Sequence, residues 1–187
     1  MAAFLGPTPR PSPPPASPPE GPVPLRPELA RRLESPASYD AIFQVVREAV
    51  RRVLGIERPG LGLGLSDLPP GLGAYWQVTG NLIVMNEGLV EVMRDRAGSP
   101  AEFNSFVYVI LAHEYLHALG YLDERSVRQV TARVTRTAFG PNHIATRMAE
   151  GDLWRLYPFL AYAPGGHGRH LRVVPRFDLA TTDQYIR

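Results

Sequence analysis

The chain has 187 residues, 44% of them hydrophobic and 20% charged, which is enough apolar material for one folded domain with a core. All twenty basic residues are Arg and there is no Lys or Cys, so Schiff-base and thiol catalysis, thiolate metal sites and disulfides are excluded. The formal net charge of +2 is too small to indicate a nucleic-acid partner.

The composition divides the chain into three parts. Residues 1 to 27 hold eleven of the twenty prolines, whose rings remove backbone donors and prevent helix formation, so we expect a disordered Pro-rich tail. Residues 28 to 164 carry the periodic apolar patterns of a folded domain, and residues 165 to 187 form an arm punctuated by Gly and Pro. The start lacks a signal segment and no long apolar run follows, which predicts a cytoplasmic protein without a membrane partner.

The first half of the domain predicts a helix, a strand and a hairpin. From Tyr39 to Leu54, apolar residues recur at helical spacing, and Gly55 follows as a stop signal. Three leucines alternate between positions 61 and 65, which indicates a strand. Residues 74 to 86 consist of two β-prone arms around Thr79-Gly80, a tight turn.

The second half is mainly helical. Residues 87 to 96 predict one helix, and Ser99, Pro100 and Glu102 form the start signature of the next. Residues 124 to 139 repeat apolar positions at helical spacing, and residues 142 to 150 predict a further short helix. In the arm, the run LRVV is the single strand-like segment. The whole pattern predicts an α+β domain in which a three-stranded sheet with the hairpin packs on the helix that follows Ser99.

That helix carries the segment FVYVILAHEYLHALGYLDE, in which His113 and His117 stand four residues apart. Residues at this spacing project from one face of a helix, so two imidazoles can meet one metal ion. Glu114 lies beside the first His, where it can reach a metal-bound water, as in the H-E-x-x-H pattern of metalloproteases. The residues before the motif are apolar and predict a buried helix, in which imidazoles need a polar partner.

The chemistry expected of this pattern is hydrolysis with one zinc ion as the cofactor. Zinc lowers the pKa of a bound water to roughly 7 and polarises a carbonyl group. Glu114 would act as general base on zinc-bound water and would deliver the proton to the leaving amine, which predicts a peptidase acting on a peptide or protein. A chance match of the five-residue pattern on an exposed helix face is the alternative.

Two histidines leave a third protein ligand to be found, and the candidates are Asp123, Glu124 and His143. Asp123 is preferred, because Gly120 can adopt the positive φ that ends the helix and turns the chain back over the metal. Its alternative role is the N-cap of the helix that follows. Glu124 is interpreted as a first-turn partner of the helix dipole, and His143 as a surface residue at a helix start.

The motif resembles the metzincin pattern in the variant whose third ligand is Asp, with the spacing His113-Glu114-x-x-His117-x-x-Gly120-x-x-Asp123. The resemblance covers eleven residues and implies a zinc peptidase with a Met beneath the metal, for which Met148 is the best-placed candidate. The order helix, strand, hairpin, helix and zinc helix is also similar to compact prokaryotic zincins, which implies a zincin-like catalytic domain over residues 28 to 164.

A second resemblance is to the YbeY-type endoribonucleases, in which two His four residues apart precede Leu-Gly-Tyr and a third ligand at the position of Asp123. That family has Gly where this chain has Glu114, and His where it has Asp123. The resemblance implies a metal-dependent ribonuclease as an alternative activity. A non-catalytic zinc-binding interaction domain is the third interpretation.

For a peptidase, we expect an extended substrate to bind beside an edge strand at residues 81 to 86 through main-chain hydrogen bonds. Tyr115 and Tyr121 flank the motif and are interpreted as packed rings with their hydroxyl groups at the rim. His167 and His170 belong to the arm, which we expect to be an exposed tail. The alternative is an arm folded over the cleft, which would make the enzyme latent.

Overall fold

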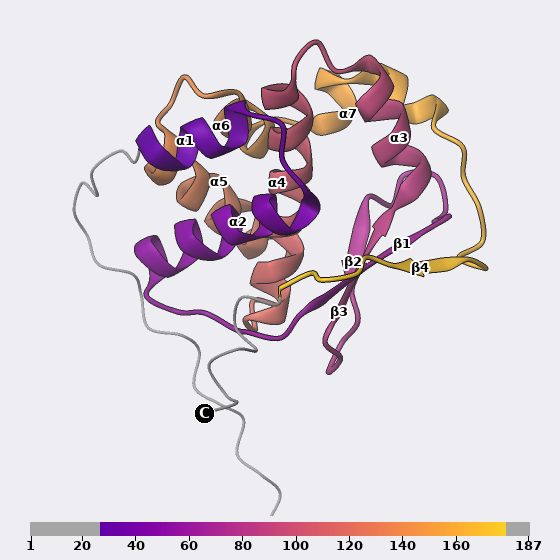
Figure 1. Ribbon diagram of the computed structural model, residues 1–187, viewed down its shortest axis with the longest axis horizontal. Coiled ribbons are helices and arrows are strands. Elements are labelled where there is room, and N and C mark those ends of the chain that lie inside the picture. Colours follow the sequence, from indigo (N-terminus) through magenta and orange to yellow (C-terminus); the bar gives the residue numbers. More distant parts are fainter. Residues whose placement is uncertain (1–26, 179–187) are drawn as a thin grey trace, which may run out of the picture.

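The computed structural model describes residues 27 to 178, so the predicted Pro-rich tail lies outside it except for Pro27, which begins the first helix. Within this range the fold is α+β, with seven α-helices, one short 3-10 helix and a four-stranded mixed sheet. The elements are α1 (Pro27–Glu34), α2 (Tyr39–Leu54), β1 (Gly62–Ser66), β2 (Ala74–Trp76), β3 (Leu82–Asn86), α3 (Glu87–Arg96), α4 (Pro100–Ala118), α5 (Glu124–Phe139), α6 (Ile144–Glu150), α7 (Leu153–Leu156), η1 (Pro158–Tyr162) and β4 (Leu171–Val173) (Figure 1).

Helix α4 lies at the centre of the molecule, with α1, α2, α5 and α6 on one side of it and the sheet on the other (Figure 1). It contacts α1, α2, α5 and α6 as well as strands β2 and β3. Its side chains are buried on nearly every face, as expected for a helix that is apolar all round. Although α4 has 19 residues, neither it nor any other helix between residues 27 and 178 is long and apolar enough to cross a membrane.

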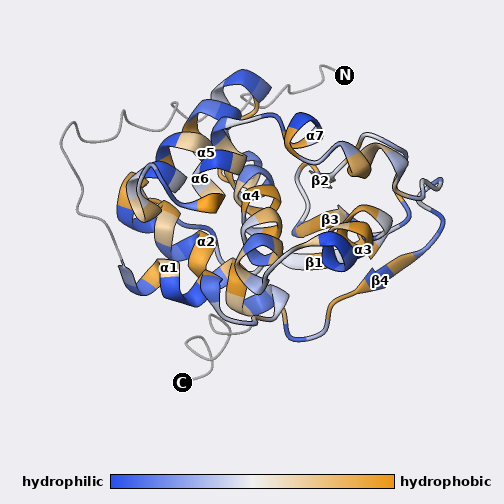
Figure 2. Cartoon of the chain, turned by 90° about the horizontal axis from the view of Figure 1, so that it is seen from above, coloured by the Kyte–Doolittle hydropathy of each residue, from blue (hydrophilic) through white to orange (hydrophobic). Residues whose placement is uncertain are grey.

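Local signals explain where the helices begin and end. Helix α2 covers its predicted residues and stops at Gly55, whose φ is 72°. Ser99 caps α4, because its hydroxyl oxygen accepts a hydrogen bond from the backbone N–H of Glu102. Helices α3 and α5 likewise cover the ranges predicted for them. Helices α1, α2 and α5 carry hydrophilic residues outside and hydrophobic residues toward α4 (Figure 2), so burial of one apolar face holds each in place.

The sheet has the strand order β2-β3-β1-β4, with β1 parallel to β3 and the other pairs antiparallel. The predicted hairpin is confirmed as β2 and β3, and Thr79 in its turn has a positive φ of 65°. The prediction of three strands is incomplete, because β4 adds a fourth from the arm. The expected edge strand at residues 81 to 86 is wrong, since β3 is interior and β2 is the edge strand in contact with α4.

The C-terminal segment is attached to the domain as far as Asp178 and is not a free tail, although His167 and His170 are exposed as expected. Strand β4 pairs with β1, and the ring of Phe177 stacks on that of Phe43 with centroids 4.6 Å apart. The buried Asp178 carboxylate accepts a hydrogen bond from Arg47 at 2.5 Å and two more from backbone N–H groups in the loop before β1. Residues 179 to 187 lie outside the described range.

The described part of the arm follows the edge of the sheet opposite to β2. The backbone N–H groups of His167 and His170 donate to the carboxylate of Asp67, in the loop after β1. None of the residues that line the pocket beside His113 and Glu114 comes from residues 165 to 178. An arm folded over the cleft is therefore not seen in the part of the chain that the structure describes.

Candidate metal centre

The two histidines of the motif lie near the end of α4, with their rings in an edge-to-face arrangement. The Nε2 atoms of His113 and His117 are 3.2 Å apart. The side chain of Glu124, in the first turn of α5, reaches both of them. Its Oε1 lies 3.1 Å from the Nε2 of His117, and its Oε2 lies 3.3 Å from the Nε2 of His113. The short connection between α4 and α5 brings this carboxylate to the histidines.

The spacing of these three side chains fits a single metal ion. Zinc bonds to nitrogen and oxygen are about 2.0–2.2 Å long, and tetrahedral angles then separate two ligand atoms by about 3.3–3.6 Å. The two imidazole nitrogens are 3.2 Å apart, each lies 3.1 or 3.3 Å from a different oxygen of Glu124, and one ligand atom from each residue lies within 4.8 Å of the other two. Two imidazoles with one carboxylate are, in addition, a ligand set typical of catalytic zinc sites. The residues present therefore fit zinc.

The third member of this cluster is Glu124, whereas Asp123 was the ligand preferred from the sequence. The Asp123 carboxylate accepts a hydrogen bond of 2.8 Å from the backbone N–H of Ser126 and so caps α5. Hydrogen bonds from Ser126 also lower the pKa of the Asp123 carboxyl group. Asp123 therefore has the capping role that was its alternative, while Glu124 turns toward the histidines.

The turn that ends α4 orients His117. Gly120 has a φ of 100°, its N–H donates to the carbonyl of His117, and the N–H of Tyr121 donates to the carbonyl of Leu116. This pair of bonds is a Schellman motif, which needs a residue in the left-handed region. It directs the Tyr121 carbonyl to 2.8 Å from the Nδ1 of His117. Donation from Nδ1 to that carbonyl leaves the Nε2 lone pair free for a metal, as in known metal sites.

Glu114 lies on the side of α4 that turns toward β2. The residue is only 7% exposed, and burial raises the pKa of its carboxyl group to about 7. The neighbouring His117 and a hydrogen bond from the backbone of Trp76 both act to lower this pKa, but burial outweighs them. A carboxyl group with a pKa near neutrality can accept a proton at pH 7 and release it again.

Burial has the opposite effect on the pKa of His113, the residue before Glu114. It lowers the pKa of the His113 imidazole, and the nearby Glu124 carboxylate only partly offsets this by favouring the protonated form. The lowered pKa keeps the imidazole neutral at physiological pH. Only the neutral ring offers a lone pair to a metal, so the environment favours the binding-competent form.

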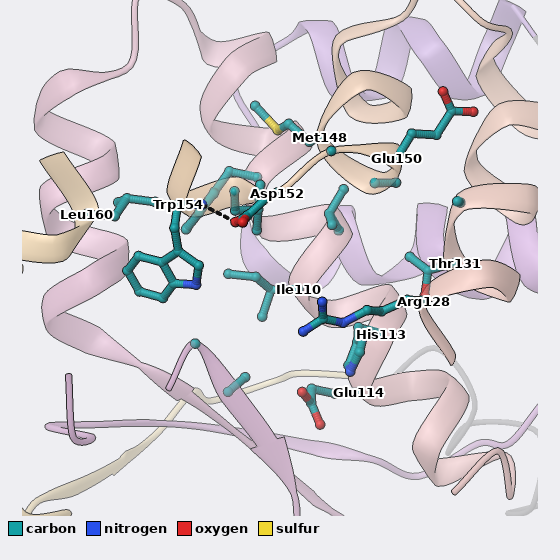
Figure 3. Close-up of a pocket in the computed structure, with 18 of the residues that line it drawn as sticks. Ile110, His113, Glu114, Arg128, Thr131, Met148, Glu150, Asp152, Trp154 and Leu160 are labelled. Carbon is teal, nitrogen blue, oxygen red and sulfur yellow. Dashed lines mark hydrogen bonds between the residues drawn. The ribbon is translucent and has the colours of Figure 1, made fainter. Parts of the chain in front are cut away.

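A pocket of about 690 Å³ opens beside His113 and Glu114 (Figure 3). Its floor is formed by α4 residues one or two turns before the motif, which lie on the same face of the helix as His113 and Glu114. The floor residues are apolar: Phe106, Val109 and Ile110. The loop before β2, helices α5 and α6 and the residues around α7 form the walls, and Arg128 of α5 lies beside His113 (Figure 3). The pocket is thus apolar along α4 and charged at the motif.

The other residues singled out in the sequence have different positions. His143 caps α6, where its Nδ1 accepts from a backbone N–H, and its ring stacks on Phe139. Met148 lines the far wall of the pocket on α6 (Figure 3). The hydroxyl group of Tyr115 is hydrogen-bonded to the backbone of the loop after α2, and Tyr121 contributes its carbonyl to the site.

Two contributors were not anticipated, the backbone of Trp76 and the side chain of Arg128. Arg128 follows Glu124 by four residues, so helical spacing alone could have placed both on the same face of α5. Nothing local to residue 76 links it to Glu114, because their proximity depends on how β2 packs against α4.

Comparisons of the chain with protein-family models, curated proteins and solved structures found no match. The likeness to metzincins and compact zincins therefore remains a resemblance over a short motif. A function has to be inferred from the geometry of the site.

Proposed function

We propose that the protein is a zinc-dependent peptidase in which His113, His117 and Glu124 hold the metal. The observation that carries this proposal is the convergence of these three side chains within 3.3 Å of one another. A buried carboxylate, Glu114, stands next to them with a pKa of about 7. A structural zinc site needs no such base beside it, whereas hydrolysis does.

In the proposed reaction, Glu114 is the general base. When bound, zinc would supply Lewis acidity, which acidifies a water molecule and polarises the substrate carbonyl. The Glu114 carboxylate accepts a proton from the attacking water as its oxygen bonds to the carbonyl carbon. The same group then donates that proton to the amide nitrogen as the C–N bond breaks. The low dielectric around Glu114 strengthens these interactions.

The edge strand β2 is the proposed binding surface for the peptide backbone. The N–H of Gln77 donates to the carbonyl of Leu82, and the carbonyl of Gly73 accepts from the N–H of Asn86, so both residues point their backbone groups toward β3. Because these groups alternate along a strand, those of Ala74 and Trp76 point away from β3. An extended peptide that added to this edge would run past Glu114. The apolar floor of the adjacent pocket suits a bulky apolar side chain next to the scissile bond.

The test is cleavage of unfolded casein and of a peptide library by the zinc-loaded full chain. The full chain is needed because residues 165 to 178 are part of the fold. We expect zinc-dependent cleavage that Glu114→Gln abolishes while zinc stays bound. An RNA substrate serves as a parallel arm. RNA cleavage that survives Glu114→Gln, or one zinc per chain with no cleavage of any substrate, would contradict the peptidase proposal.

A further inference from the structure

Arg58, in the loop between α2 and β1, joins two parts of the site that are distant in sequence. Its Nη1 donates a 2.8 Å hydrogen bond to the carbonyl of Ala118, the last residue of α4. Its Nη2 donates to the carbonyl of Gly80 at 3.1 Å and to the Oδ1 of Asn81 at 2.8 Å, both in the turn between β2 and β3. One planar guanidinium thus connects the end of the metal helix to the edge hairpin.

Two further contacts fix this arrangement. The guanidinium lies over the ring of Trp76, 5.5 Å from its centroid, and the Trp76 indole N–H donates to the same Gly80 carbonyl at 3.1 Å. The backbone N–H of Arg58 itself donates to the hydroxyl group of Tyr115 at 2.7 Å, and Tyr115 is fully buried in α4. Arg58 is therefore anchored to α4 by its backbone and by its side chain.

The position of β2 matters because Trp76 faces Glu114. The Trp76 backbone lies close enough to the Glu114 carboxyl group to lower its pKa, and the same strand forms the edge proposed to bind substrate. Strand β2 has only three residues and pairs on one side only. Pairing with β3 sets its register but not its distance from α4. The contacts of Arg58 span that gap directly.

We propose that Arg58 is a positioning residue that holds the edge of β2 at a fixed distance from Glu114 and the metal ligands. This inference rests on the proposed function, since it assigns Arg58 a role in that reaction. Arg58 itself makes no hydrogen bond or ion pair with the side chains of His113, His117 or Glu124. Its removal is expected to disturb the edge strand and to leave the metal cluster intact.

The experiment compares Arg58→Gln and Arg58→Lys with Arg32→Gln, a matched control that removes an ion-paired Arg on α1. Three quantities are measured on each full-length protein: zinc per chain, peptide kcat and KM, and the hydrogen exchange rate of individual amides. Lys can reach one of the three acceptors but lacks the planar fork, so it is the conservative variant.

We expect the Arg58→Gln protein to keep one zinc per chain. Its Trp76 amide hydrogen should exchange on the order of tenfold faster than in the wild type, while the amide hydrogens of α2 exchange at unchanged rates. Its kcat should fall by about tenfold or more, as for other misplaced catalytic groups. Arg58→Lys should recover part of that loss, and Arg32→Gln should change none of these quantities.

Two results would overturn the inference. One is an Arg58→Gln protein whose Trp76 amide exchange and kinetics equal those of the wild type. The other is loss of zinc together with faster exchange throughout the domain, which would make Arg58 a general support of the fold. If the wild type cleaves no peptide, the proposed function fails, and the Trp76 exchange rate still decides whether Arg58 holds β2.

Discussion

Asp123 and Glu124 are adjacent carboxylates that serve different roles at the start of α5. Both follow Gly120 closely enough to reach the end of α4, so the motif spacing does not separate them. The N-cap role needs a short side chain that can bend back to an N–H two or three residues ahead, which suits Asp better than Glu. The longer Glu124 side chain can then extend to the histidines. Capping preference is thus the local signal that favours Glu124 as the ligand.

Exchange of these two carboxylates for Ala should separate their roles. Glu124→Ala is expected to weaken zinc binding on the order of 100-fold or more, since loss of even an outer-shell partner weakens metal sites by about 10–100-fold. Asp123→Ala should bind zinc nearly as well as the wild type but be less stable because it loses its cap. Competition with a chromophoric chelator measures the first effect and urea unfolding the second. Equal weakening of zinc binding by both variants would refute the assignment.

The raised pKa of Glu114 predicts a pH dependence in the metal-free protein. The ordinary pKa of 4.5 applies to the unfolded chain, and the folded value is about 7. Between these values the unfolded state has lost a proton that the folded state retains, so folding stability falls as pH rises through this window. The full effect is about 3 kcal/mol, at about 1.4 kcal/mol for each pKa unit.

Glu114→Gln provides the comparison, because it carries no titrating group at this position. The difference in unfolding free energy between the two metal-free proteins should shift by about 3 kcal/mol in favour of the variant from pH 4.5 to pH 8. Chemical denaturation at four or five pH values is sufficient. Parallel stability curves would mean that Glu114 titrates as an exposed carboxylate.

At the level of elements, the sequence predicts helices far better than the sheet. Helices α2, α3 and α5 were anticipated from apolar spacing and end signals, because these depend on residues within a few turns of one another. The strand order depends on pairing between distant segments, and the parallel pairing of β1 with β3 has no local signature. For the same reason the edge strand was assigned to residues 81 to 86 when it is β2.

The turn after α4 links backbone conformation to metal affinity. Gly120→Ala would place a residue with a Cβ in the left-handed region, which costs about 1–2 kcal/mol of folding stability. The strained turn would also shift the Tyr121 carbonyl away from the Nδ1 of His117. We expect zinc affinity to fall about 10–100-fold, as for other lost outer-shell partners. Isothermal titration with zinc gives the affinity directly.

Gly55→Ala is the matched control for that substitution. Gly55 ends α2 with a φ of 72°, and neither glycine has a neighbour that a Cβ would meet. Both variants should lose similar stability, but only Gly120→Ala should lose zinc affinity. If Gly55→Ala weakens zinc binding equally, the effect is one of overall stability and the link between the turn and His117 is refuted.

For the whole molecule, the main departure from expectation is the C-terminal segment. Strand β4 has only three residues, all exposed, between Gly-rich and Pro-containing segments, so its sequence resembles a tail. It pairs with β1 beside Gly64, which leaves room for the end of the exposed Leu171 side chain. This partner strand lies more than a hundred residues away in the sequence. The run LRVV predicts the strand itself, but the sequence of the arm alone does not reveal its partner.

Asp178→Ala is expected to destabilise the protein by about 3–5 kcal/mol. It removes the buried carboxylate that accepts hydrogen bonds from Arg47 and from two backbone N–H groups, and buried donors that lose their acceptor are strongly unfavourable, although Arg47 keeps its ion pair with Glu57. Asp178→Asn should lose less, because an amide oxygen can still accept from the loop before β1. Thermal unfolding monitored by circular dichroism measures both. A change below about 1 kcal/mol for Asp178→Ala would mean that the segment adds little to the fold.

The central claim is that His113, His117 and Glu124 hold one metal ion between them. A crystal structure of the zinc-loaded protein, with anomalous data collected at the zinc edge, tests it most directly. The account predicts one strong peak per chain, about 2.0–2.2 Å from both Nε2 atoms and from a Glu124 oxygen. A peak bonded to Asp123 in place of Glu124, or no peak at the two histidines, would contradict it.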